Sequence, residues 1–450
     1  MKKISKLLML FLILLIYNNT SIAQDKPSKQ ILITNVKVWD GTSEKLINSD
    51  VLVEGNLIKQ VRKDISAPGD ATIIDGGGKT LIPGLIDAHW HLSIIDAPHK
   101  LSNDVNWMWW GAVAGNNAEE VLMRGFTTVR DAGGPAIGLA TAIDQGIIPG
   151  PRVYPSGPFI SQTSGHGDFR NYSQQHPNMT DDKRFTDKYF TFLSDGPDEV
   201  TRSTREALRL GATQIKLMAG GGTASPYDPL HTVQFSPEEL KAAINAAADW
   251  GTYIMVHAYN DASVLRCVEA GVKSIEHGVL LNEEVIEIIA EKKVWVVPTI
   301  AIVTNNTYES ILEFLGPAVA EKFKVLNSGT LKMMRLLKKH NVKVGFGTDF
   351  FGPMEIQIKQ SLEFGARLVE WNSREILMQA TSINAEILKM SGELNPYKDG
   401  KLGVIENGAY ADLLIVDGNP LEDIRVLENP DKNLKIIMKD GVIYKNTLNN

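Results

Sequence analysis

The sequence predicts an α/β fold: a (β/α)8 TIM barrel with a small β-sandwich domain built from both chain ends. In the middle of the chain, apolar runs of strand length recur and are separated by helical patterns. Strands that alternate with helices form a parallel sheet, and eight such strands close into a barrel. The candidate strands are residues 82–88, 127–131, 151–156, 214–219, 253–258, 274–277, 294–299 and 343–348.

Helical patterns fill the gaps between several of these strands. They cover residues 197–211, 236–251, 261–271 and 282–293, and several of them begin at Asp, Ser or Asn and end at Gly. The alternative to a barrel is an open doubly wound sheet. No glycine fingerprint of a dinucleotide site follows the early strands, which disfavours that alternative.

The two chain ends share a different character. Residues 30–81 and 400–446 carry short β runs broken by Gly, Asn and Asp, so they predict two parts of one small β domain. We therefore expect the N-terminal part of this domain at 24–81, the barrel at 82–395 and the C-terminal part at 396–450.

One connection inside the barrel region is much longer than the others. Residues 158–197 are rich in Gly, Ser, Asn and Pro and have little periodicity. A loop of this length in a compact domain is usually functional or disordered. We interpret it as a lid over the barrel mouth.

The first residues form a separate unit. Lys2, Lys3 and Lys6 precede an apolar run at 7–16, and small residues follow at 21–23. This pattern predicts a secretory signal peptide at residues 1–23, and hence an exported protein, periplasmic or secreted. A membrane anchor is the alternative, but the run is short for about 30 Å of hydrocarbon. We expect no stable anchor after cleavage.

The charge balance excludes one class of partner. A formal net charge of -7 offers no basic field to attract phosphates, so we expect no nucleic acid partner. The expected partner is a small molecule or a dipeptide, and the sequence leaves a homo-oligomer open.

A histidine pair marks the end of the first barrel strand. His89 and His91 are two residues apart, as are Asp87 and His89, so these side chains share one face of a strand. Barrel active sites form at the C-terminal ends of the strands. Two imidazoles on one rigid strand suit an ion of the zinc class.

Four further polar residues end separate predicted strands: Lys216, His257, His277 and Asp349. A lysine in an apolar strand is costly unless it is paired or chemically changed. Carbamylation by CO2 is one such change, and it produces an anion able to bridge two metal ions. The alternative, a set of unrelated buried groups, requires the coincidence to occur on five strands.

These residues and two flanking segments resemble the amidohydrolase superfamily. "LIPGLIDAHWHL" is similar to its entry signature and "GKLGVIENGAYADLLIVDGNP" to its exit signature. The resemblance implies two divalent metal ions, for which zinc best suits the nitrogen-rich ligands. It implies one ion on His89, His91 and Asp349, the other on His257 and His277, and carbamylated Lys216 bridging both.

Within the superfamily, the chain resembles the imidazolonepropionase-like, prolidase-like group of dipeptide hydrolases. "QIKLMAGGGTASPYDPL" and "SQTSGHGDF" are similar to segments of that group. The resemblance implies that His166 polarises the scissile carbonyl and that Tyr259 meets the terminal carboxylate of the substrate. Lys216 argues against imidazolonepropionase activity itself. Asn260 stands where deaminases of the superfamily have a glutamate, which argues against deamination.

The expected enzyme is an exported binuclear-metal amidohydrolase. It hydrolyses a C–N bond of a dipeptide or an N-acyl amino acid by attack of a hydroxide that bridges the two metal ions. Asp349 takes the proton and passes it to the leaving amine. The alternatives are a lactonase or esterase on the same site, an imidazolonepropionase-like hydrolase of cyclic amides, and a non-catalytic scaffold.

Overall fold

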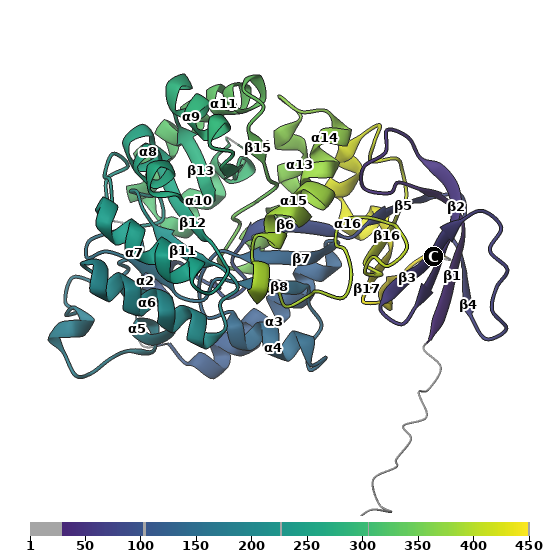
Figure 1. Cartoon of the computed structure of the whole chain (residues 1–450), viewed down its shortest axis with the longest axis horizontal. Coiled ribbons are helices and arrows are strands. Elements are labelled where there is room, and N and C mark those ends of the chain that lie inside the picture. Colours follow the sequence, from purple (N-terminus) through teal and green to yellow (C-terminus); the bar gives the residue numbers. More distant parts are fainter. Residues whose placement is uncertain (1–28, 102–104, 226, 305, 449–450) are drawn as a thin grey trace, which may run out of the picture.

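The computed structural model describes residues 29–101, 105–225, 227–304 and 306–448, so the signal peptide predicted at 1–23 lies outside it. Within the described part, no helix is both long and apolar enough to cross a membrane. Figure 1 shows a body rich in helices beside a smaller β region that contains both early and late segments of the chain.

Two parallel sheets form the centre of the body. The smaller has the order β6 (Leu85–Trp90), β7 (Phe126–Asp131), β8 (Arg152–Pro155). The larger has the order β10 (Thr191–Leu193), β9 (Phe159–Ser161), β11 (Ile215–Met218), β12 (Ile254–Asn260), β13 (Ser274–Leu280), β14 (Trp295–Val297), β15 (Lys343–Val344). Every one of the predicted barrel strands is present, and the fold is of the TIM-barrel α/β type.

Backbone hydrogen bonds connect both edges of the smaller sheet to the larger one. The Ala88 amide in β6 donates to the Phe346 carbonyl, 2.8 Å away, just beyond β15. At the other edge, the Thr213 amide before β11 donates to the carbonyl of Pro155 in β8, also at 2.8 Å. The ends of the strands from both sheets are thereby brought together.

Helices surround these sheets (Figure 1). Their bounds are α2 Pro98–Leu101, α3 Trp107–Met123, α4 Ile137–Asp144, α5 Phe185–Tyr189, α6 Pro197–Leu210, α7 Pro237–Ala248, α8 Asp261–Ala270, α9 Glu283–Glu291, α10 Tyr308–Leu315, α11 Ala320–Lys339, α12 Met354–Gln357, α13 Leu362–Arg367, α14 Ser373–Met378, α15 Asn384–Lys389 and α16 Pro430–Asn433. The four helices that the sequence predicts are α6 to α9. Ser236 caps α7 in a capping box with Glu239, and α6 ends at Gly211 in the left-handed conformation.

The segment 158–197 is more ordered than its composition predicts. It contains β9, a 3-10 turn at Pro177–Met179, α5 and β10, and its two strands extend the larger sheet. The single long loop predicted there is therefore divided by these short elements. Each of these strands has three residues and lies in a polar, Gly- and Ser-rich segment, so no apolar run of strand length marked it in the sequence. Its role as a lid stays a prediction.

The β region is one sheet made from both chain ends. Its order is β18 (Val442–Asn446), β17 (Leu434–Lys439), β16 (Leu413–Val416), β5 (Thr80–Pro83), β1 (Gln30–Val38), β2 (Ile47–Glu54), β3 (Leu57–Arg62), with β4 (Thr72–Asp75) also beside β1. Antiparallel pairing of β16 with β5 joins the late strands to the early ones. The sandwich arrangement and the domain boundaries stay predictions.

The predicted first barrel strand, 82–88, spans the junction between the two regions. It is divided into β5, which belongs to the β region, and β6, which belongs to the body. Gly84 stands between them, and a Cβ atom there would lie 2.1 Å from Oγ1 of Thr127. Only glycine fits at this close approach.

Candidate metal centre and pocket

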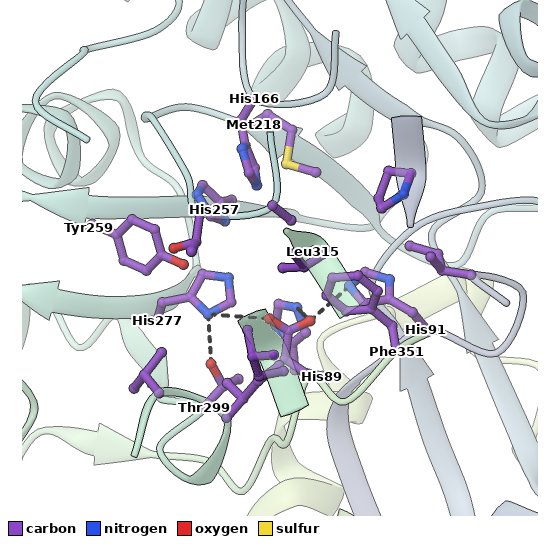
Figure 2. Close-up of a pocket in the computed structure, with 18 of the residues that line it drawn as sticks. His89, His91, His166, Met218, His257, Tyr259, His277, Thr299, Leu315 and Phe351 are labelled. Atoms are coloured by element: carbon purple, nitrogen blue, oxygen red, sulfur yellow. Dashed lines mark hydrogen bonds and ion pairs between the residues drawn. The ribbon is translucent and has the colours of Figure 1, made fainter. Parts of the chain in front are cut away.

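All the site residues that the sequence predicts line a single pocket. Figure 2 labels the histidines and Tyr259 among them. The site residues come from the central strands and the loops that follow them: His89 on β6, Lys216 on β11, His257 and Tyr259 on β12, and His277 on β13, with His91, His166 and Asp349 on loops. The strands β12 and β13 continue to Asn260 and Leu280, so His257 and His277 do not end them as the sequence predicted. Parallel strands end at the same side of a sheet, so residues far apart in the sequence converge there.

Two histidines and one carboxylate form the tightest group. Nε2 of His91 lies 3.1 Å from Oδ1 of Asp349, and Nε2 of His89 lies 3.5 Å from the same oxygen. One donor atom from each of these residues lies within 4.8 Å of the others. Nitrogen and carboxylate donors at such distances can converge on one divalent ion.

The other two histidines lie beside this group. The ring of His277 is 4.8 Å from that of His89 and 4.7 Å from that of His257, measured between centroids. Nδ1 of His277 contacts Oγ1 of Thr299 at 2.9 Å and lies 4.0 Å from Oδ2 of Asp349. The second predicted ligand pair is therefore adjacent to the first.

The electrostatics of the pocket favour neutral imidazoles. Burial, and then the positive charge of Lys216, hold the pKa of His89 well below its usual value. Burial, and then the charge of His166, do the same to the pKa of His257. Burial also lowers the pKa of His277 to about 4. Metal ions bind the neutral form of histidine, so these residues fit a metal site.

Lys216 is the most unusual member of the group. Its side chain is 1% exposed, and no hydrogen bond or salt bridge to it is found among the described residues. Burial lowers the pKa of its amine to about 8, although Glu276 and Asp349 act in the opposite direction. A buried ammonium without a partner is costly, and a neutral amine is the form that reacts with CO2.

Asp349 and His277 share a second property. Their φ angles are 59° and 74°, in the left-handed region that side chains rarely adopt. Such strained conformations cluster at functional sites, where the surrounding structure fixes them. Burial would raise the pKa of Asp349, but the charges of His89, His277 and His91 and a hydrogen bond to His91 lower it below its usual range.

Comparison with known proteins identifies the family of the chain. Residues 80–444 match the amidohydrolase family. The chain belongs to that family. The resemblance predicted from its motifs is confirmed, and the chain is a hydrolase that acts on carbon–nitrogen bonds of the amide type.

Three similar proteins cover nearly the whole amidohydrolase chain. An ochratoxinase from Aspergillus niger is 30% identical over 94% of this chain and 88% of its own. A prolidase solved with N-methylphosphonate-L-proline is 34% identical, with a TM-score of 0.84 over 93% of this chain and 100% of its own. A Xaa-Pro dipeptidase solved with methionine in its active site is 30% identical, with a TM-score of 0.78 over the same shares.

Sequence reasoning missed the residues that lie behind the amidohydrolase pocket. Glu276 is fully buried and contacts Nδ1 of His89 at 2.7 Å, while Nη2 of Arg130 binds the same carboxylate at 2.8 Å. Ser274 adds a hydrogen bond of 2.6 Å. Such partners orient the ring of a metal ligand. The sequence does place the charged residues Arg130 and Glu276 inside apolar strands. This could have revealed the pair, because charged side chains are seldom buried unless they are paired.

His166 reaches the pocket from the segment after β9. Its ring stacks on that of His257, with centroids 4.1 Å apart and planes at 21°. Its Nδ1 lies 2.6 Å from Oγ of Ser225 and 3.1 Å from Oδ2 of Asp228, two residues that the sequence analysis did not select. A Cβ on Gly222 would lie 2.0 Å from this ring, so glycine is required beside it.

Tyr259 and Asn260 follow His257 on β12. The Tyr259 ring lies 4.7 Å from His257 and 5.2 Å from His277, and burial raises the pKa of its hydroxyl above the usual value. Asn260 caps α8 by accepting from the Ser263 amide, and it donates to the Leu230 carbonyl, each at 3.0 Å. Asn260 therefore holds the backbone around the pocket.

The pocket wall that faces the polar groups is apolar. Its side chains come largely from the region between β14 and β15, which contains a 3-10 turn at Ala301–Val303, α10 and the start of α11. They include Ile302, Ile311, Leu315 and Phe323, joined by Phe159 and Phe351. A pocket with a polar floor and an apolar wall binds a substrate that has both a reactive polar group and an apolar group.

Proposed function

We propose that this amidohydrolase is an exported enzyme with two divalent metal ions that cleaves dipeptides or N-acyl amino acids carrying an apolar side chain. The observation that supports this most strongly is the convergence of four histidines, Lys216 and Asp349 in one pocket with an apolar wall.

The proposed ligands are those implied by the motifs. His89, His91 and Asp349 would hold one ion, His257 and His277 the other, and carbamylated Lys216 would link them. Zinc best suits these nitrogen-rich donors. Divalent ions in such a site lower the pKa of a water from about 15.7 towards about 7, which supplies a nucleophile at neutral pH.

Asp349 and His166 supply the remaining chemistry. The Asp349 carboxylate faces the pocket and can take the proton of the attacking water and return it to the leaving amine. Nδ1–H of His166 donates to Ser225 and to the Asp228 carboxylate, and the imidazolium form, which that carboxylate stabilises, can also donate from Nε2 to the substrate's carbonyl oxygen. A donor of this kind typically lowers the barrier by about 3 kcal/mol.

The substrate class follows from the pocket and from the relatives. The names of two similar structures, a prolidase and a Xaa-Pro dipeptidase, support a dipeptide substrate, and the ochratoxinase supports an amide hydrolase. The apolar wall would receive the side chain next to the cleaved bond, and Tyr259 would meet the terminal carboxylate. Export rests on the N-terminal pattern of residues 1–23.

A direct assay tests this function. The zinc-loaded protein is given dipeptides and N-acyl amino acids that differ only in one side chain, alongside lactones, esters and cyclic amides. We expect the linear amides with apolar side chains to have the highest kcat/KM, and Asp349→Asn protein to be the inactive control. Faster turnover of lactones or cyclic amides would replace the proposal with the corresponding alternative.

A further inference from the structure

Lys322, in the first turn of α11, binds the backbone of a distant loop. Its Nζ donates to three carbonyl oxygens, those of Gly222, Ser225 and Asp228, each at 2.8 Å. An ammonium group has three N–H donors, so this one cation is saturated by a single loop. Lys322 is partly buried, and no carboxylate forms a salt bridge with it among the described residues.

The loop bound by Lys322 is the one that orients His166. Asp228 accepts a hydrogen bond of 2.6 Å from the Gly222 amide, so the loop is also closed on itself. Ser225 and Asp228 then contact Nδ1 of His166, and both are buried. Lys322 on α11 therefore binds the carbonyls of this loop, and the side chains of Ser225 and Asp228 in the same loop bind the imidazole of His166.

The electrical environment fits this arrangement. Burial would raise the pKa of Asp228, but the charge of His166, hydrogen bonds from His166 and Ser225, and the charge of Lys322 lower it below its usual value. Burial lowers the pKa of Lys322 while Asp228 acts in the opposite direction. The ammonium of Lys322 and the carboxylate of Asp228 thus both hold Gly222, the first by its carbonyl and the second by its amide.

We propose that Lys322 is a positioning residue, which sets the catalytic geometry of His166 through Gly222, Ser225 and Asp228 without touching the substrate. The inference rests on the proposed function for its kinetic part only. The neighbouring residue, Phe323, lines the pocket wall. The same turn of α11 therefore both shapes the substrate cavity and fixes the loop that carries the partners of His166.

The experiment compares Lys322→Met with Lys324→Met in the zinc-loaded protein. Lys324 lies on the same helix but is exposed and pairs with Glu321, so it is a matched control. Hydrogen exchange is measured on peptides that contain Gly222. We expect faster exchange at the Gly222 amide only in the Lys322 variant, with metal content unchanged.

Kinetics in two backgrounds separate positioning from general damage. Lys322→Met should lower kcat by about 10- to 100-fold, as expected when a catalytic group is misplaced. In a His166→Gln background, the same change should lower kcat less than about 2-fold, because the residue it positions is already gone. Equal losses in both backgrounds, or unchanged exchange at Gly222, would overturn the proposal.

Two provisions keep the test decisive. Should Lys322→Met not fold, Lys322→Gln removes the charge but keeps donors, and the same exchange pattern is expected from it. The exchange measurement needs no substrate. If the wild-type protein hydrolyses no linear amide, the proposed function fails, while faster exchange at Gly222 would still support the loop contact and unchanged exchange would refute it.

Discussion

The carboxylate of Glu276 lies 2.7 Å from Nδ1 of His89, on the opposite side of the ring from the nitrogen that faces Asp349. Because Arg130 binds the same carboxylate, the ring is held from behind by a fully buried ion pair. The orientation of one predicted metal ligand therefore depends on two residues that never reach the pocket.

Replacing this carboxylate tests that dependence. Glu276→Gln leaves Arg130 buried without its counter-charge, so we expect the free energy of unfolding to fall by about 3–5 kcal/mol. Metal affinity should fall about 10- to 100-fold. Urea unfolding and metal titration measure both effects. Glu386→Gln, in an exposed pair with Lys389, is the control and should change stability by less than about 0.5 kcal/mol. Wild-type stability in Glu276→Gln would contradict the role of the ion pair.

The proton path is tested at Asp349. Asp349→Asn keeps an oxygen donor beside His91 but removes the base, so metal content should stay mostly in place. We expect kcat to fall by about 10²- to 10⁴-fold. Metal analysis and steady-state kinetics on the same sample separate the two effects. Near-wild-type turnover would remove Asp349 from the proton path.

Lys216 gives a test by chemical rescue. Lys216→Ala should lose activity and bind fewer metal ions, because the proposed bridge is gone. Short carboxylic acids added with zinc should partly restore the rate by occupying the space of the carbamate. The measurement is kcat against acid concentration, with the wild-type protein as control. If metal content and rate were unchanged in the variant, the bridging role would be wrong.

The loss of folding stability at acidic pH should depend on Asp228. Its pKa is lower in the folded protein than in an unfolded chain, for which about 3.9 is usual, so its ionised form stabilises the fold. That contribution is complete above about pH 4 and is lost as the pH falls through the folded-state pKa. Asp228→Asn should therefore lower Tm most at neutral pH, and its difference from wild type should shrink towards pH 3. A difference that stays constant across this range would exclude the linkage.

Tyr259 is tested through its substrate. Tyr259→Phe should lower kcat/KM more for peptides with a free terminal carboxylate than for the same peptides with an amidated end. The comparison uses both substrates on both proteins. Equal losses of kcat/KM for the two substrates would show that the Tyr259 hydroxyl does not bind the substrate's terminal carboxylate.

The sequence predicted the strands and the pocket residues for one physical reason. The strand that carries a polar residue is enough to place that residue, and parallel strands all point to the same side of a sheet. Polar residues late in several apolar runs are therefore expected to lie close together. His257 on β12 and His277 on β13 therefore came together as expected.

The remaining features depend on partners that no local pattern specifies. Glu276 precedes His277 and, by strict alternation, should face away from the pocket; its role arises from Arg130 and His89, which lie far away in the sequence. Likewise, nothing in the sequence distinguishes Lys322 from an ordinary lysine on a helix surface, and its role arises because the fold places three carbonyls around it. β9 and β10 were missed because each has three residues inside a segment rich in Gly, Ser and Asn, without the longer apolar run that marked the strands at 294–299 and 343–348.

The pairing of β16 with β5 has a consequence for biosynthesis. Leu413 of β16 aligns with Pro83 of β5. Because β5 is synthesised early and β16 near the end of translation, one edge of β5 stays unpaired for most of synthesis. Until then β5 presents unpaired amides and carbonyls, which is the type of edge that invites aggregation. Polypeptides interrupted before β16 keep that edge open, and they should be cleared by proteases even when their barrel strands are intact.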